Sequence, residues 1–206
     1  YQPIVAVGSG ETVSAEALLR WQHPTRGLLG PDTFIPIAEQ NGLMVPIGAW
    51  VLDEVMSQMR RWRDSGLTIP IAFNVSVCEF RDAAFFERLS AAICRYSIKP
   101  ETLTIEVTES LAIDTAERTQ QTLARCRELG VRISLDDFGT SHSCLANVKR
   151  LPITTLKIDK LFVRDVATSR TDAAIVTAIL TFAKSLGLET VAEGVETVEE
   201  LRNHCS

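Results

Sequence analysis

The strongest constraint in this sequence is a repeated order of short apolar strands and longer amphipathic helices. Apolar residues recur at a helical period in one set of segments and alternate with polar residues in the other. Strands that are joined through helices pair in parallel, so this order predicts an α/β fold with a mainly parallel sheet. The predicted strands are 71–76, 103–108, 131–136, 155–159 and 189–192, and the predicted helices are 32–40, 45–63, 82–96, 115–129, 143–149, 171–186 and one from 197.

The start of the chain departs from this order. Residues 2–7 and 12–21 both have the pattern of a strand, and the short turn Gly8-Ser9-Gly10 joins them. Two strands linked by so short a turn form an antiparallel hairpin. We therefore expect the first strand of the sheet to run antiparallel to the second.

Polar side chains in these strands fall on the face opposite the apolar side chains. In 103–108, Leu103, Ile105 and Val107 share one face, which leaves Glu106 on the other. A sheet covered by helices on both faces would be apolar on both, so the alternation favours a barrel with helices outside only. The same reasoning places six polar residues on the inner face, namely Glu16, Arg20, Asn74, Glu106, Asp136 and Lys157.

Acidic residues gather near the carboxyl ends of the predicted strands, where barrel enzymes place their catalytic groups. The set consists of Glu16, Glu106, Asp136, Asp137 and Glu193, the last lying just beyond its strand. So many carboxylates in one place must take up protons or bind cations. Carboxylate oxygens and the amide oxygen of Asn74 are ligands that suit Mg²⁺ or Mn²⁺.

The adjacent pair Asp136 and Asp137 can bridge two such ions. Two metal ions held close together are a common arrangement for phosphodiester hydrolysis. Lys157 and Arg20 would then neutralise the charge of the phosphate.

Charge and cysteine content exclude several other classes of protein. A net charge of -5 argues against a protein that coats a DNA or RNA duplex. The five cysteines form no CxxC pair, which is typical of a reduced, cytoplasmic protein. The sequence has no signal peptide and no apolar run long enough to span a bilayer, so we expect no membrane contact by this segment, although a parent protein could be membrane-anchored.

Seven motifs occur in a fixed order along the chain. They are EALLRW (Glu16 to Trp21) followed by HP, then PDTFIPIAEQNGL, FNVS, EVTES, DDFGTS, LKIDK and AEGVET. Together they resemble the EAL domain, a family of bacterial cyclic di-GMP phosphodiesterases. The resemblance implies a TIM-like (β/α)8 barrel, spanning residues 1–206 as one domain, that cleaves one phosphodiester of cyclic di-GMP to give linear pGpG.

The resemblance also implies what this segment lacks. A complete barrel takes about 250 residues, whereas the chain has 206 and ends before the family's eighth strand. We therefore expect the eighth strand and last helix to be missing, and the segment to belong to a longer protein with fused sensory or diguanylate cyclase-like domains. The chain begins at Tyr1 rather than at a methionine, which agrees with that expectation.

By resemblance, the acidic residues divide between two metal ions. Glu16, Asn74, Glu106 and Asp136 correspond to ligands of the first ion. Asp136 would bridge to the second ion, which Asp137 also binds.

The remaining site residues are also assigned by resemblance. Lys157 and Glu193, together with Glu16, would carry catalysis by orienting or activating the attacking water. Arg20, Leu18 and Lys157 would contact the substrate. A further group would couple metal binding to a homodimer interface, and it consists of Glu109, Gly139 and Thr140.

Three positions depart from the family pattern. Ser141 and His142 stand where the family usually has Gly and Tyr, and Glu79 stands in place of Gln. None of them removes a residue expected to bind metal.

Two alternative functions are open to such a chain. Degenerate EAL domains serve as cyclic di-GMP receptors or protein-interaction modules, but they lose carboxylates that this sequence retains. A barrel aldolase with Lys157 as its Schiff-base amine is disfavoured, because the surrounding carboxylates would keep that amine protonated.

Overall fold

A curled, mainly parallel sheet forms the centre of the molecule, as the alternation of strands and helices predicts. The computed structural model describes residues 1–109, 111, 117–139, 148 and 151–195. Seven strands pair in the order β1-β2-β5-β6-β7-β8-β9. They are β1 (Gln2–Val5), β2 (Thr12–Ala17), β5 (Ile71–Asn74), β6 (Leu103–Thr108), β7 (Arg132–Phe138), β8 (Thr155–Ile158) and β9 (Glu189–Ala192).

The first strand pair differs from the rest, and this prediction is confirmed. β1 runs antiparallel to β2, and Gln2 lies opposite Glu16. Every later pair in the sheet is parallel.

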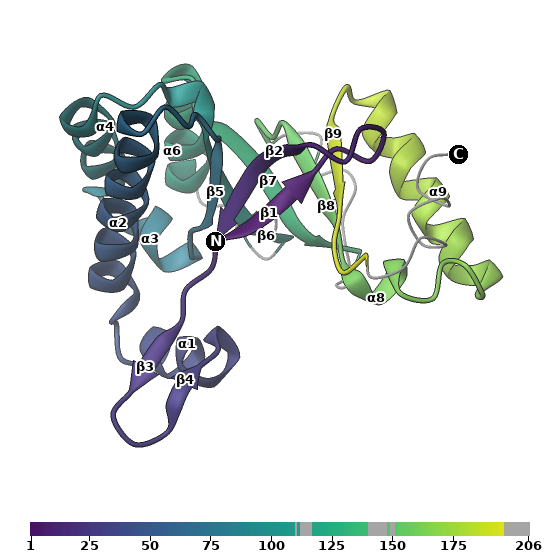
Figure 1. Cartoon of the computed structure of the whole chain (residues 1–206), viewed down its shortest axis with the longest axis horizontal. Helices are drawn as coiled ribbons and strands as arrows, with labels where there is room; N and C mark the ends of the chain where they lie inside the picture. Colours follow the sequence, from purple (N-terminus) through teal and green to yellow (C-terminus); the bar gives the residue numbers. More distant parts are fainter. Residues whose placement is uncertain (110, 112–116, 140–147, 149–150, 196–206) are drawn as a thin grey trace.

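Helices cover the outer face of the sheet. α2 (Met44–Asp64), α4 (Phe85–Tyr96) and α6 (Glu117–Glu128) lie together beside β5 and β6, while α9 (Arg170–Ser185) lies near β8 and β9 (Figure 1). The strand side chains that face these helices are almost completely buried, among them Phe73, Leu103, Ile105, Ile133, Leu135 and Leu156. The fold is therefore an incomplete TIM-like α/β barrel with its hydrophobic core between sheet and helices.

The longest helix shows why the sequence adopts this packing. In α2, Leu52, Val55, Met56 and Met59 recur at helical spacing and are all buried. This spacing places them on one stripe of the helix, which packs against the rest of the core. Among the described residues, no helix combines the length and the hydropathy needed to cross a bilayer.

The predicted helix 82–96 corresponds to α4, and a short helix that was not predicted precedes it. This short helix, α3 (Val77–Arg81), begins at a capping box, in which the Ser76 hydroxyl accepts from the backbone N–H of Glu79 and the Glu79 carboxylate accepts from that of Ser76. Asp82 then adopts an extended conformation and ends α3 before α4 begins. A 3-10 helix, η1 (Pro100–Thr102), leads from α4 into β6.

The prediction of one continuous strand over 12–21 is wrong, because a small lobe begins between β2 and α2. β2 ends at Ala17, and β3 (Trp21–His23) instead pairs antiparallel with β4 (Gly27–Leu29). These two strands and α1 (Pro31–Gln40) project away from the sheet (Figure 1). Arg20 therefore follows the strand rather than lying within it, and its side chain is exposed.

The described residues in the second half of the sequence include a helix that the pattern did not predict. α8 (Lys160–Val163) follows β8 directly and precedes α9. The predicted helices 143–149 and from 197 fall largely or wholly outside the described residues.

Candidate active site

A buried lysine lies at the centre of the acidic residues. Only 2% of the Lys157 side chain on β8 is exposed. Its Nζ lies 3.2 Å from Glu16 Oε2 and 3.0 Å from Glu106 Oε2. The same atom lies 3.3 Å from Asp136 Oδ1 and 2.6 Å from Glu193 Oε1. One ammonium group therefore contacts four carboxylates from β2, β6, β7 and the end of β9.

Asn74 connects two of these carboxylates. It is the last residue of β5 and lies opposite Glu106 in the parallel register. Its Nδ2 donates to Glu16 Oε1 at 3.0 Å and to Glu106 Oε2 at 3.3 Å. Both hydrogen bonds use the nitrogen, and among the described residues the amide oxygen has no partner, so this oxygen could serve as a metal ligand.

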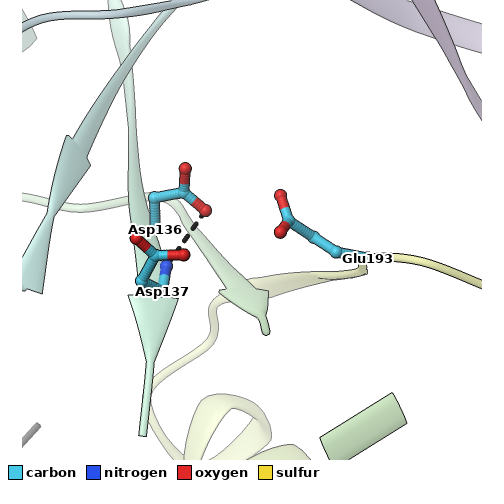
Figure 2. A group of neighbouring side chains, drawn as sticks. All are labelled: Asp136, Asp137 and Glu193. Atoms are coloured by element: carbon cyan, nitrogen blue, oxygen red, sulfur yellow. Dashed lines mark hydrogen bonds between the residues drawn. The ribbon is translucent and has the colours of Figure 1, made fainter. Parts of the chain in front are cut away.

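A bulge in β7 brings Asp137 toward the same site. In a regular strand Asp136 and Asp137 would point to opposite faces. The register with β8 shifts between Leu135 and Phe138, and Asp137 has a φ of +54°, a conformation that non-glycine residues rarely adopt. Both aspartates consequently face Glu193 (Figure 2), and one carboxylate oxygen from each of the three lies within 4.8 Å of the others.

Burial shifts the pKa values of these acids upward. Burial raises the pKa of Glu106 to about 8, although the nearby Lys157 opposes this rise. Burial and then the charge of Asp136 raise the pKa of Asp137 to about 6, and they also raise the pKa of Glu193. The site thus favours bound protons unless further positive charge is supplied.

The pKa of Lys157 responds to two opposing effects. Burial would lower it, but the carboxylates of Glu106, Asp136, Glu16 and Glu193 together raise it above its ordinary value. Lys157 therefore keeps its positive charge, which agrees with the argument against a Schiff-base amine.

Asp159 is a member of the acidic group that the sequence reasoning missed. Its buried carboxylate accepts from the backbone N–H of Leu161 at 2.7 Å, and a hydrogen bond to Asp159 contributes to the raised pKa of Asp137. The signal was present, because Asp159 lies two residues after Lys157 and so has the same strand parity.

The chemistry of this donor set fits divalent metal ions. Six carboxyl groups converge here, and Lys157 is in contact with four of them. The six belong to Glu16, Glu106, Asp136, Asp137, Asp159 and Glu193. Oxygen ligands with an excess of negative charge suit hard cations such as Mg²⁺ and Mn²⁺.

Two of the residues expected to contact substrate line a cavity beside α2. Leu18 and Arg20 follow β2 and line a cavity of about 280 Å³ together with Trp50 and Glu54 of α2. The Arg20 guanidinium donates to the backbone oxygen of Leu19 at 2.8 Å. None of the six carboxyl groups of the acidic cluster lines this cavity.

The residues expected to couple the site to a dimer lie at the ends of β6 and β7. Glu109 follows β6 and is buried, and neither of its carboxylate oxygens has a hydrogen-bond partner among the residues that the structure describes. Gly139 follows β7 with a φ of +99°. Thr140 lies outside the described residues, as do Ser141 and His142.

Comparison with known proteins agrees with the sequence motifs. The family model described as "EAL domain" matches residues 1–204. The bifunctional diguanylate cyclase/cyclic di-GMP phosphodiesterase MucR of Pseudomonas aeruginosa is 46% identical over 198 residues, which cover 96% of this chain and 29% of MucR. The cyclic di-GMP phosphodiesterase PdeR of Escherichia coli is 38% identical over 200 residues, covering 97% of this chain and 30% of PdeR. The chain thus spans less than a third of these two relatives.

Solved structures share the fold. The structure of the PaMucR phosphodiesterase in complex with c-di-GMP has a TM-score of 0.92 and 45% identity, and the match covers 98% of this chain and 83% of that one. The EAL enzyme Bd1971, bound to cAMP and cyclic di-GMP, has a TM-score of 0.93 and 32% identity, with 98% and 56% covered.

Proposed function

The chain belongs to the EAL domain family, and we propose that it hydrolyses one phosphodiester bond of cyclic di-GMP to give linear pGpG. The observation that carries this proposal is the convergence of Glu16, Glu106, Asp136 and Glu193 on Lys157. The substrate is supported by the relatives, since MucR and PdeR are named cyclic di-GMP phosphodiesterases and the PaMucR structure is a c-di-GMP complex.

Two Mg²⁺ or Mn²⁺ ions are the proposed cofactors. Glu16, Asn74, Glu106 and Asp136 would hold the first, and Asp136 and Asp137 the second. When bound, such ions lower the pKa of water and polarise a phosphodiester oxygen. The bulge at Asp137 supports this assignment, because a strained backbone conformation at an acidic residue persists only where the surrounding structure maintains it.

Lys157 and Glu193 are the proposed catalytic pair, with Glu16 as the third catalytic residue. Lys157 keeps its charge and lies 2.6 Å from Glu193, so it can hold that carboxylate in place and would supply positive charge beside the phosphate. The raised pKa of Glu193 makes its carboxylate a better proton acceptor near neutral pH. Glu193 would therefore take the proton of the attacking water.

Substrate contacts and regulation complete the proposal. Arg20 and Leu18 would contact the substrate from the loop after β2, with the Arg20 guanidinium on a phosphate. Glu109, Gly139 and Thr140 would connect the site to a homodimer interface. The buried carboxylate of Glu109 has no partner within the described part of the chain, which supports a role that depends on another group reaching it.

The protein context is also a proposal. The length of MucR and PdeR supports a single EAL domain within a longer protein that carries fused sensory or diguanylate cyclase-like domains. A cytoplasmic location agrees with the described cysteines, Cys78, Cys94 and Cys126, which form no disulfide.

Metal-dependent turnover is the test of this function. Purified protein should convert cyclic di-GMP to pGpG in Mg²⁺ or Mn²⁺ and not in EDTA, as followed by chromatography of the nucleotides. Glu16→Ala should abolish turnover, while Glu101→Ala, which alters an exposed carboxylate in η1, should leave it unchanged. Tight binding of cyclic di-GMP without turnover in either metal would favour the receptor function instead.

A further inference from the structure

The short helix α8 lies next to two segments of the acidic cluster. It begins directly after Asp159, whose carboxylate caps its first turn. One segment beside it leaves β7 after Phe138, and the other follows Glu193 beyond the end of β9. Each contact is made at a glycine, and each glycine lies one or two residues from a carboxylate that faces the proposed metal centre.

Gly194 makes the closer of the two contacts. It follows Glu193 and has a φ of +66°. A Cβ at this position would lie 2.7 Å from Lys160 Cβ and 3.6 Å from Lys160 Cα. Because Lys160 Cβ is fixed to the backbone of α8, no rotation of the lysine side chain can relieve this clash. Only a displacement of the chain around Gly194, or of α8, can do so.

Gly139 makes the second contact. It lies two residues after Asp137, and a Cβ here would lie 2.9 Å from Cε2 of the Phe162 ring. Phe162 and Lys160 are both residues of α8. The same four-residue helix therefore supports the backbone next to Asp137 and the backbone next to Glu193.

We propose that Gly194 and Gly139 are positioning residues that seat Glu193 and Asp137 on α8, so that Glu193 can join Asp136 and Asp137, one oxygen of each lying within 4.8 Å of the others, in holding the second metal ion. This inference rests on the proposed function. Real Cβ atoms essentially never approach another atom within 3.0 Å, so a methyl group on Gly194, 2.7 Å from Lys160 Cβ, forces a displacement of the backbone beside Glu193. Changes in the residues that orient metal ligands typically cost about 10- to 100-fold in metal affinity.

A matched pair of glycine variants separates positioning from general strain. Gly187 precedes β9 and has a φ of +67°, close to that of Gly194, but a Cβ there would meet nothing within 4 Å. Gly194→Ala and Gly187→Ala thus impose the same backbone strain. Only the first also imposes a clash with α8.

The test is the affinity of each variant for Mn²⁺, measured by calorimetry or electron paramagnetic resonance, together with the melting temperature. We expect both variants to melt earlier than wild type, and only Gly194→Ala to lose Mn²⁺ affinity, by about tenfold or more. Lys160→Gly in the Gly194→Ala background removes the clashing Cβ and should restore most of the affinity. Equal affinities in Gly194→Ala and Gly187→Ala would overturn the inference.

A variant that does not fold and a wild-type protein that binds no Mn²⁺ are two further outcomes, and each can be told apart from a failure of the inference alone. If Gly194→Ala does not fold, Gly139→Ala provides the same comparison at the other contact, and an affinity equal to that of Gly187→Ala would refute the proposal. If the wild-type protein itself binds no Mn²⁺, the proposed metal centre fails, and this inference fails with it.

Discussion

Replacement of Lys157 by methionine tests the electrostatic account of the site. The change keeps most of the side-chain volume but removes the one ammonium group that contacts four carboxylates. Removing one partner from a buried ion pair costs about 3–5 kcal/mol. For a chain of this length that corresponds to a fall in melting temperature of roughly 6–20 °C.

The loss of stability caused by Lys157→Met should be larger at higher pH. The folded-state pKa of Glu106, about 8, lies above its ordinary value, so between those values the folded state holds more protons than the unfolded state. Stability without metal is therefore lost as the pH rises toward 8. Lys157 opposes the rise in the pKa of Glu106. In Lys157→Met this pKa should therefore rise further, and the loss of stability should continue to higher pH.

Urea denaturation in EDTA at pH 6 and pH 8 measures both effects. We expect Lys157→Met to unfold at lower urea than wild type, with the larger difference at pH 8. Lys99→Met, which removes an exposed lysine, is the matched control and should unfold with wild type. A Lys157→Met midpoint equal to that of wild type at pH 8 would refute the reasoning.

Three other predictions follow from the same site. Mn²⁺ affinity should rise with pH from about 5.5 to 8.5, because Asp137 and Glu106, with pKa values of about 6 and 8, must lose protons to bind metal; a flat profile in calorimetry would contradict this. Asp137→Gly should raise the melting temperature in EDTA by relieving the positive φ, yet weaken Mn²⁺ binding; unchanged binding would exclude Asp137 as a ligand. Ca²⁺, which prefers larger and looser coordination, should inhibit turnover in Mg²⁺; Ca²⁺-supported turnover would count against a two-metal site.

Most of the candidate site could be predicted from strand parity, that is, from the alternation of side chains between the two faces of a strand. Glu106 and Lys157 alternate with apolar neighbours inside regular strands, so their direction follows from local geometry alone. Seven motifs then identified the family, and the order of strands in the sheet agrees with the predicted barrel.

The features that the pattern missed depend on contacts between distant segments. The bulge that turns Asp137 inward arises from the pairing of β7 with β8, and parity predicts the opposite face. Arg20 was placed on a strand because 12–21 has one continuous pattern, whereas β3 pairs with β4 in a separate lobe. α3 and α8 are too short to form from helix propensity alone, so caps and tertiary packing decide where they form.

The most direct test of the central claim is hydrolysis in water labelled with ¹⁸O, followed by mass spectrometry of the nucleotides. The wild-type protein in Mg²⁺ should release pGpG that carries one ¹⁸O atom in its terminal phosphate, and EDTA should stop its formation. Product formation that continues in EDTA, or pGpG without the label, would contradict metal-dependent attack of water at this site.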